Sequence, residues 1–318
     1  MEINKLNTKI LSSLGQGGSI FGITLLDLMK EQENIVVLSA DMSTPAGLDK
    51  FKSLYADHFF NLGIAEQNMI GVAAGLMDEG YKTISVAQAC FISMRCFEPV
   101  RQFLGYMHSK QVLVGIGSGF SLTFMGNTHY ALEDIALMRS IPGMTVIAPS
   151  DALQAMKALE AAMRKDGPVY IRLHGGAALP IVYEEDFDFE IGKAISLRTG
   201  KDIQLIATGS MVSIALQVAD QLAGEGISVS VFDMHTIKPL DTTILDMGVP
   251  VIISLEEHRV IGGLGDSIAD YLSRYESHPR LLKIGVKDEF SVVGDYSYLM
   301  EQNGLSRDKI VERVKSFL

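Results

Sequence analysis

Short apolar runs alternate with helical segments along this 318-residue chain, and this alternation limits the folds that it can adopt. Continuous runs of this kind are typical of strands that are buried on both faces of a parallel sheet. In the first half they occur at 35–39, 83–86, 111–115, 145–148 and 169–173. Helices are expected between them, at 1–30, 64–79, 92–107, 132–139 and 151–165. Strands that alternate with helices predict a parallel sheet with right-handed crossovers.

The second half repeats this alternation. Strands are expected at 203–207, 229–231, 251–254 and 281–284, and helices at 210–223, at 263–275 and from Ser306. Between the halves, the charge run Glu184-Glu185-Asp186 lies in a stretch without clear periodicity, which favours a linker. The sequence therefore predicts two parallel-sheet α/β domains, at 1–178 and 196–318, joined by a linker at 179–195.

Composition and charge exclude several classes of protein. A hydrophobic content of 47% with 20% charged residues is typical of a packed globular chain. The net charge of −11 argues against nucleic acid or an anionic membrane surface as a partner, because both need a basic face. The first residues lack the apolar core of a secretion signal, and no stretch approaches the length of a membrane helix. We therefore expect a cytoplasmic protein, and Cys90 and Cys96 give no metal-type or disulfide pattern.

The stretch from Asn61 to Gly75 contains the most informative residue of the chain. A loop closes on Gly63, and a helix of small and apolar residues follows with Glu66 in its first turn. An ionised carboxylate beside such an element is costly without a partner. A carboxylate in a first turn is also favoured by the helix dipole, so Glu66 equally fits a solvent-facing charge. The residues alone leave both interpretations open.

From about Ser19 to Leu318 the chain resembles transketolases, and specifically the small subunit of split, two-chain transketolases. The motif Gly63-Ile64-Ala65-Glu66-Gln67-Asn68-Met69 is similar to the family's glutamate motif in the pyrimidine-binding (Pyr) domain. In that family the glutamate hydrogen-bonds N1′ of the aminopyrimidine ring of thiamine diphosphate, so the resemblance gives Glu66 this catalytic role. It implies transfer of a two-carbon ketol unit from a ketose-like donor to an aldehyde acceptor, with the cofactor supplying the difficult chemistry.

Four further residues occupy family positions around the cofactor, and three of them match the family residue. Phe91 matches the second of two phenylalanines that form an aromatic wall for the pyrimidine, and Gln88 stands in place of the first. Asp41 matches an aspartate beside the thiazolium region, and His129 matches a catalytic histidine that hydrogen-bonds a substrate oxygen. Each also has an ordinary structural interpretation: Phe91 as a core residue, Asp41 as a cap, and His129 as a surface residue. The glycines at 115–119 and 262–265 do not complete a dinucleotide fingerprint.

The side chains with which transketolases bind sugar phosphates are replaced here. The positions of two family arginines fall at Gly18 and at His174 or Gly175. The position of a serine falls at Pro45, that of a histidine at Ile116 or Gly117, and that of an aspartate at Met125. Each charge-assisted contact to a phosphate is worth about 1.5–3 kcal/mol. We therefore expect a small carbonyl substrate other than a simple pentose or hexose phosphate.

The resemblance also implies a partner. The family binds the cofactor diphosphate through Mg²⁺ and a G-D-G…N motif on a separate (PP) domain, and this motif is missing from the chain. A second polypeptide should carry the diphosphate and Mg²⁺ ligands in an α2β2 heterotetramer, and no residue here is assigned to the metal. Two alternatives remain: a 2-oxoacid dehydrogenase beta-type subunit, which has the same two-domain plan, and a non-catalytic scaffold subunit.

Overall fold

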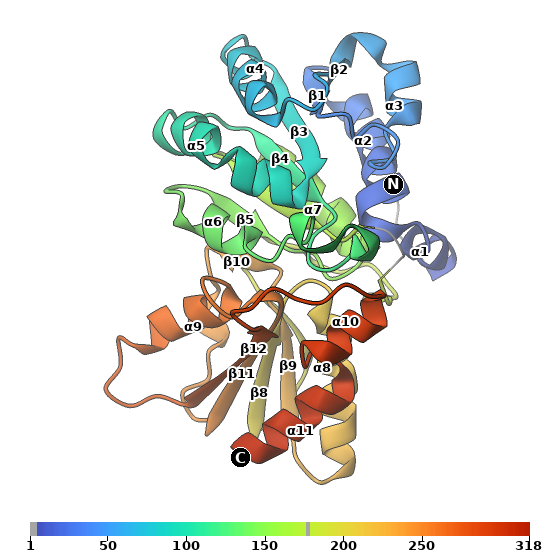
Figure 1. Ribbon diagram of the computed structural model, residues 1–318. Coiled ribbons are helices and arrows are strands. Elements are labelled where there is room, and N and C mark those ends of the chain that lie inside the picture. The colour runs from blue at the N-terminus through green and yellow to red at the C-terminus, as the bar shows by residue number, and fades with distance from the viewer. Residues whose placement is uncertain (1–4, 176–178) are drawn as a thin grey trace.

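The computed structural model describes residues 5–175 and 179–318, and it contains two α/β halves, each built on its own sheet (Figure 1). The first sheet has the strand order β10-β5-β6-β4-β3-β1-β2. Its strands are β1 (Ile35–Ser39), β2 (Phe59–Asn61), β3 (Lys82–Gln88), β4 (Val112–Ile116), β5 (Thr145–Ile147), β6 (Val169–Leu173) and β10 (Thr236–Lys238). All neighbouring strands are parallel except β10 and β5.

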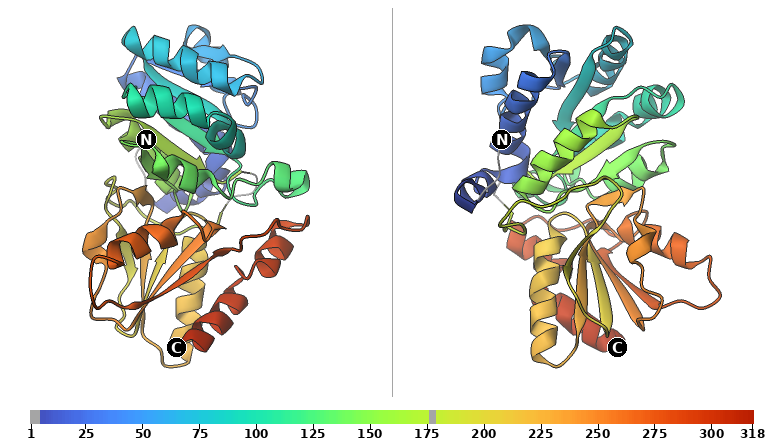
Figure 2. Two further views of the ribbon diagram at one scale, coloured as in Figure 1. Left: turned by 60° about the vertical axis from the view of Figure 1, so that its left-hand side comes forward. Right: turned by 180° about the vertical axis from the view of Figure 1, so that it is seen from behind.

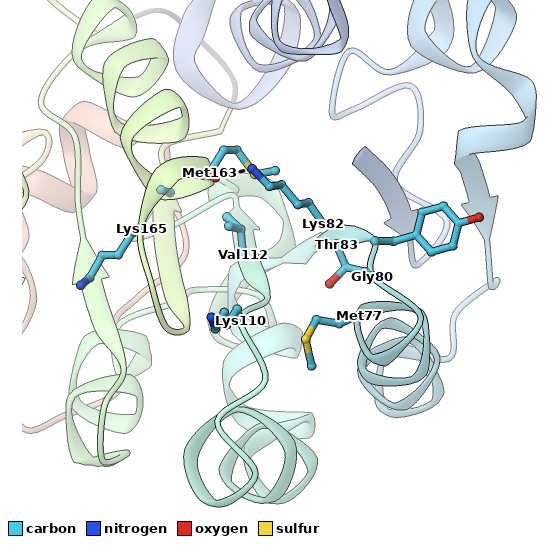
Figure 3. Close-up of a pocket in the computed structure, with 10 residues that line it drawn as sticks. Met77, Gly80, Lys82, Thr83, Lys110, Val112, Met163 and Lys165 are labelled. Carbon is cyan, nitrogen blue, oxygen red and sulfur yellow. Dashed lines mark hydrogen bonds between the residues drawn. The ribbon is translucent and has the colours of Figure 1, made fainter. Parts of the chain in front are cut away.

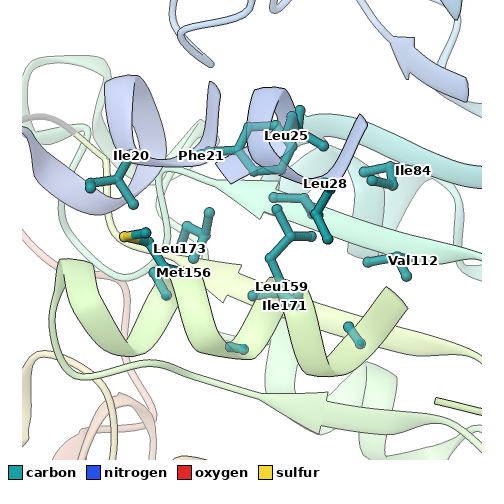
Figure 4. Close-up of a cluster of buried hydrophobic side chains, with 14 of the residues drawn as sticks. Ile20, Phe21, Leu25, Leu28, Ile84, Val112, Met156, Leu159, Ile171 and Leu173 are labelled. Carbon is teal, nitrogen blue, oxygen red and sulfur yellow. The ribbon is translucent and has the colours of Figure 1, made fainter. Parts of the chain in front are cut away.

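Helices cover both faces of this sheet, because alternate strand residues point to opposite sides. One face packs against α1 (Lys5–Ser12), η1 (Gly15–Ile20), α2 (Phe21–Glu31) and α7 (Ala152–Arg164). The other packs against α4 (Glu66–Asp78), η3 (Phe91–Arg95), α5 (Phe97–Val100), η4 (Arg101–Tyr106) and α6 (Asp134–Ser140). Figure 4 shows the first of these cores, where Leu25 and Leu28 of α2 face Leu159 of α7 next to Ile171 of β6.

The second sheet has the order β12-β11-β8-β9-β7. Its strands are β7 (Ile195–Arg198), β8 (Ile203–Ala207), β9 (Val229–Asp233), β11 (Val251–Arg259) and β12 (Arg280–Val286), and only β7 runs antiparallel to its neighbour. The helices α8 (Met211–Gly224), α10 (Tyr296–Gln302) and α11 (Arg307–Phe317) pack on one face, and α9 (Leu264–Leu272) packs on the other. Figure 2 shows the two halves from two further sides.

The predicted fold class is confirmed: both halves are α/β units on largely parallel sheets, each with one antiparallel edge strand. The short elements α3 (Asp49–Leu54), η2 (Ala56–His58), β2, β7, β10, η5 (Thr123–Thr128), η6 (Thr242–Ile244) and α10 were not predicted. The boundaries at 178 and 195 stay a prediction. β10 in particular lies in the second half of the sequence, yet it completes the first sheet by pairing with β5.

Two helices that the sequence predicts as continuous are each divided into three segments in the structure. The helix expected over 1–30 is divided into α1, η1 and α2, and its residues 1–4 lie outside the described part of the chain. Gly15 has a φ of 72° and Gly18 a φ of −128°, so the backbone leaves the helical region twice. The helix expected over 92–107 is divided into η3, α5 and η4. Pro99 lies in this segment, and proline has no N–H for a helical hydrogen bond.

Candidate active site

The carboxyl ends of neighbouring strands in the first sheet surround an open cavity of about 210 Å3. Asp41 follows β1, Gln88 ends β3, and His129 follows η5 on the loop after β4. The chain reverses its direction of travel across the sheet here, because β2 and β3 lie on opposite sides of β1. In open α/β sheets, such a switch point at the carboxyl ends of the strands is where ligands bind.

All five residues selected from the sequence line this cavity: Asp41, Glu66, Gln88, Phe91 and His129. Ala40, Met42 and Ile64 complete the lining. The five are spread along the chain between positions 41 and 129, so only the sheet topology brings them together. Their roles stay predictions, but their convergence on one cavity is an observation.

Glu66 is the first residue of α4, and its side chain is only 3% exposed. The sequence left open whether this carboxylate faces solvent, and the structure buries it. The Arg95 guanidinium supplies the partner that a buried carboxylate needs: Nη1 donates to Oε1 at 2.7 Å and to Oε2 at 2.8 Å. Burial, together with the Glu66 charge, raises the pKa of the nearby Cys96 thiol to about 12, so Cys96 stays protonated.

Phe91 is the first residue of η3, and its ring contacts the side chains of Arg95 and His129. The Arg95 guanidinium carbon lies 4.1 Å from the centroid of the Phe91 ring, which is a cation–π contact. The His129 ring meets Phe91 edge-on, with 5.1 Å between centroids and 66° between the ring planes. His129 Nδ1 shares a hydrogen bond with Thr128 Oγ1 at 2.9 Å, so a ligand of this imidazole would meet Nε2.

Asp41 has a φ of 55°, which is the left-handed region that non-glycine residues seldom adopt. Asn61, at the end of β2, holds it there: the Asp41 N–H donates to Asn61 Oδ1 at 3.0 Å, and Asn61 Nδ2 donates to Asp41 Oδ1 at 3.2 Å. The same Asn61 Oδ1 accepts from the Gly63 N–H at 3.1 Å. One amide therefore joins the loop after β1 to the loop that precedes Glu66.

Gln88 presents an acceptor without a partner. Its Oε1 is buried and receives no hydrogen bond from the described residues. Buried acceptors in folded proteins are normally satisfied, and this unpaired one belongs to a side chain of the cavity wall.

Sequence reasoning missed two residues of this site, Asn61 and the partner role of Arg95. Asn61 opens the stretch that contains Glu66, but its side chain gave no signal of its function. Arg95 stands four residues after Phe91, at the spacing that puts two side chains on one side of a helix. That spacing was the available signal.

A second cavity, of about 150 Å3, lies at the opposite, amino-terminal ends of β3 and β4. Three lysines line it, but they do not converge (Figure 3). Lys82 Nζ donates to Gln32 Oε1 and Lys110 pairs with the exposed Asp166, while Lys165 points away from both. This cavity therefore offers no arrangement comparable with the first.

The described residues contain no group of three or more His, Cys, Asp or Glu side chains placed to hold a metal ion. None of the helices in the described ranges is both long and apolar enough to cross a membrane.

Comparison with known proteins gives one consistent result. Family models described as "Transketolase, pyrimidine binding domain" and "Transketolase, C-terminal domain" match residues 17–178 and 192–310. A 6-deoxy-6-sulfo-D-fructose transketolase subunit of a Clostridium species is 38% identical, over 90% of this chain and 89% of that protein. A subunit of the apulose-4-phosphate transketolase of Phocaeicola vulgatus is 35% identical, over 94% of this chain and 96% of that protein. A solved structure described as a split gene transketolase, inactive beta4 tetramer, has 37% identity and a TM-score of 0.83, and covers 93% of this chain and 96% of that one.

Proposed function

Because the chain belongs to the transketolase family, as a split-gene subunit, we propose that it supplies the pyrimidine-binding half of a thiamine-diphosphate-dependent ketol transferase. The observation that carries this proposal is the convergence of a buried carboxylate, an aromatic ring and an unpaired acceptor on one cavity. Transferase activity of this family type, with thiamine diphosphate, is the general function that the relatives support.

The side chains of the cavity fit the pyrimidine end of the cofactor. Phe91 offers a flat apolar surface to an aromatic ring, and Gln88 Oε1 offers an acceptor to the 4′-amino group. Glu66 offers a carboxylate to N1′ of the ring. We assign Asp41 to the thiazolium side of the cofactor and His129 Nε2 to an oxygen of the substrate.

Thiamine diphosphate, when bound, supplies a nucleophilic carbon that accepts the two-carbon unit and acts as an electron sink. The protein residues do the rest of the work. Glu66 holds and exchanges a proton at N1′, and its burial keeps water from competing for this contact. His129 orients the carbonyl oxygen of the substrate through a hydrogen bond and exchanges a proton with it. Phe91 and Gln88 fix the plane and rotation of the ring that Glu66 contacts.

A second polypeptide is part of this proposal. The chain has no G-D-G…N motif, so the ligands for the diphosphate and Mg²⁺ would come from a partner with the PP domain, in an α2β2 assembly. Two relatives are named as transketolase subunits, and one solved structure is described as a split gene transketolase, which supports a partner chain.

For the substrate, we propose a ketose other than a simple pentose or hexose phosphate. Two arginines that could have replaced the missing phosphate ligands already have partners. Arg172 is 5% exposed and is bound to Asp134 at 2.9 Å. Arg95 is bound to Glu66. One relative is named for a sulfonated fructose and another for apulose 4-phosphate, which supports a variable donor among split transketolases.

The test is reconstitution with the partner chain that carries the PP domain. We expect thiamine-diphosphate-dependent ketol transfer by the complex and none by either chain alone. Glu66→Gln should reduce kcat about 10²- to 10⁴-fold, because a positioned acid–base group contributes this much. Glu79→Gln, an exposed glutamate at the other end of α4, is the matched control and should leave kcat unchanged.

Three results would contradict the proposal. Full turnover by the Glu66→Gln complex would remove the assigned role of the carboxylate. Efficient conversion of xylulose 5-phosphate with ribose 5-phosphate would contradict the substrate class. Acetylation of a lipoyl group from pyruvate would identify a 2-oxoacid dehydrogenase component instead.

A further inference from the structure

Arg95 contacts two residues of the cavity wall at once. Its Nη1 donates to both oxygens of Glu66, and its guanidinium carbon lies 4.1 Å from the centroid of the Phe91 ring. The Glu66 side chain is 3% exposed, whereas that of Arg95 is 42% exposed. A single cation therefore joins the carboxylate and the aromatic ring that would meet the pyrimidine.

The backbone of Arg95 is held as well. Pro99, four residues later, has no N–H to donate to the Arg95 carbonyl, as a regular helix would require. Gln67 Nε2 donates to this carbonyl instead, at 2.9 Å. Gln67 follows Glu66 directly in α4, so two contacts join the start of α4 to the end of η3. The Arg95 side chain donates to Glu66, and the Gln67 side chain donates to the Arg95 backbone.

Arg95 does not itself line the cavity, whereas Glu66 and Phe91 do. The guanidinium thus approaches the carboxylate from outside the cavity. An ionised carboxylate has about four acceptor directions, and Arg95 takes two of them, one on each oxygen. The directions that face the cavity stay available to a ligand.

We propose that Arg95 is a positioning residue, which fixes the Glu66 carboxylate and the Phe91 ring relative to each other before the cofactor binds. This inference rests on the proposed function, because it concerns the same pyrimidine site. Without Arg95, the buried carboxylate would have lost its charged partner, and Glu66 would move among rotamers. A carboxylate that samples several rotamers must be ordered when the cofactor binds, which weakens binding, and it is often misplaced for the proton of N1′.

The expected effect is on the cofactor rather than on the substrate. Arg95→Met in the assembled complex should raise the Kd for thiamine diphosphate about tenfold and lower kcat, with the KM of the ketose donor unchanged. Arg95→Lys should restore part of this loss, because lysine keeps the charge but lacks the planar guanidinium that contacts the ring. Arg101→Met, an exposed arginine in η4, is the matched control and should leave the Kd unchanged.

A double-mutant cycle with Glu66→Gln decides whether Arg95 acts through Glu66. Calorimetric titration of thiamine diphosphate into the four complexes gives a readout that does not depend on turnover. We expect Arg95→Met to weaken binding in the wild-type background and to have little further effect when Glu66 is glutamine. An equal loss in both backgrounds would overturn the inference, and the Arg95→Lys complex serves in the same cycle if the methionine variant does not fold.

The result also separates this inference from the proposed function. If Glu66→Gln abolishes turnover while Arg95→Met changes neither the Kd nor kcat, only the positioning role is wrong. If Glu66→Gln leaves both cofactor binding and turnover intact, the proposed function itself fails.

Discussion

Nη1 of Arg95 lies 2.7 Å and 2.8 Å from the two carboxylate oxygens of Glu66, so one nitrogen satisfies a buried charge at the start of α4. The two residues are 29 positions apart and belong to different helical segments, which pack on the same face of the sheet. Acidic side chains are favoured at helix N-termini, and the arginine adds a full opposite charge to this effect. The carboxylate is thereby held at the cavity wall, where the pyrimidine would bind.

His129 gives the first prediction. Replacing it by asparagine removes the imidazole that we assign to a substrate oxygen. The value of kcat/KM should fall about 10- to 100-fold, because a hydrogen bond to a charged group contributes this much. The Kd for thiamine diphosphate should stay the same, because His129 meets Phe91 only by its edge. Steady-state kinetics and titration measure these quantities. His108→Asn, at an exposed histidine with a φ of 58°, is the control, and an equal loss there would argue against a site-specific role.

Gln88→Leu should have opposite effects on stability and on cofactor binding. Because Gln88 Oε1 is buried without a partner, its removal relieves a desolvation penalty, and the melting temperature should stay equal or rise. Loss of the acceptor should raise the Kd for thiamine diphosphate about two- to tenfold. Differential scanning calorimetry and titration of the complex test both signs. A fall in both quantities would indicate a structural role for Gln88.

Arg172 and Asp134 form a buried ion pair between β6 and α6, and Tyr170 also donates to Asp134 at 2.8 Å. Arg172→Met should destabilise the protein by about 3–5 kcal/mol, because it leaves a buried carboxylate without its charge partner. Arg198→Met breaks a surface pair with Asp220 and should cost less than about 1 kcal/mol. Chemical denaturation of both variants measures the difference, and similar values for the two would contradict the argument from burial.

Titration of Asp233 should make the stability of the protein depend on pH. Burial raises the pKa of its carboxyl group to about 7, against the opposing effect of hydrogen bonds from Tyr183, Ser150 and Gln154. Between the ordinary pKa of 3.8 and about 7, the folded protein keeps a proton that the unfolded chain has lost. The contribution of Asp233 to the free energy of unfolding should therefore fall as the pH rises through this window and level off above it.

The Asp233→Asn variant measures this contribution. Relative to the wild type, its melting temperature should rise as the pH rises from about 4 to about 7, since the group no longer titrates. Burial also raises the pKa of Glu256 to about 7 and lowers the pKa values of His235 and His258 to about 4, but these groups contribute to both proteins and do not affect the difference. Asp220→Asn, at an exposed aspartate, should retain the full dependence. An unchanged slope in Asp233→Asn would show that Asp233 does not keep its proton in the folded state.

Much of the fold follows from local patterns. The strand at Ile35–Ser39 was predicted with the bounds that it has, because a short run of apolar residues that ends in a serine is typical of a strand buried on both faces. The helix that begins at Glu66 was predicted from its small and apolar residues. The first thirty residues show the limit of such reasoning. Their apolar periodicity predicted one helix, but Gly15 and Gly18 divide it, and Gln16 Nε2 donates to the carbonyls of Pro149 and Asp151.

The sequence by itself determined the two α/β halves, the family and five of the residues that line the cavity, since hydrophobic periodicity and short motifs are local properties of a chain. Only the tertiary structure decided that these five residues meet, that Arg95 neutralises Glu66, and that β10 crosses from one half of the sequence to the sheet of the other. These are contacts between distant segments. They depend on which strands become neighbours and which side chains are desolvated together, and no local pattern records either.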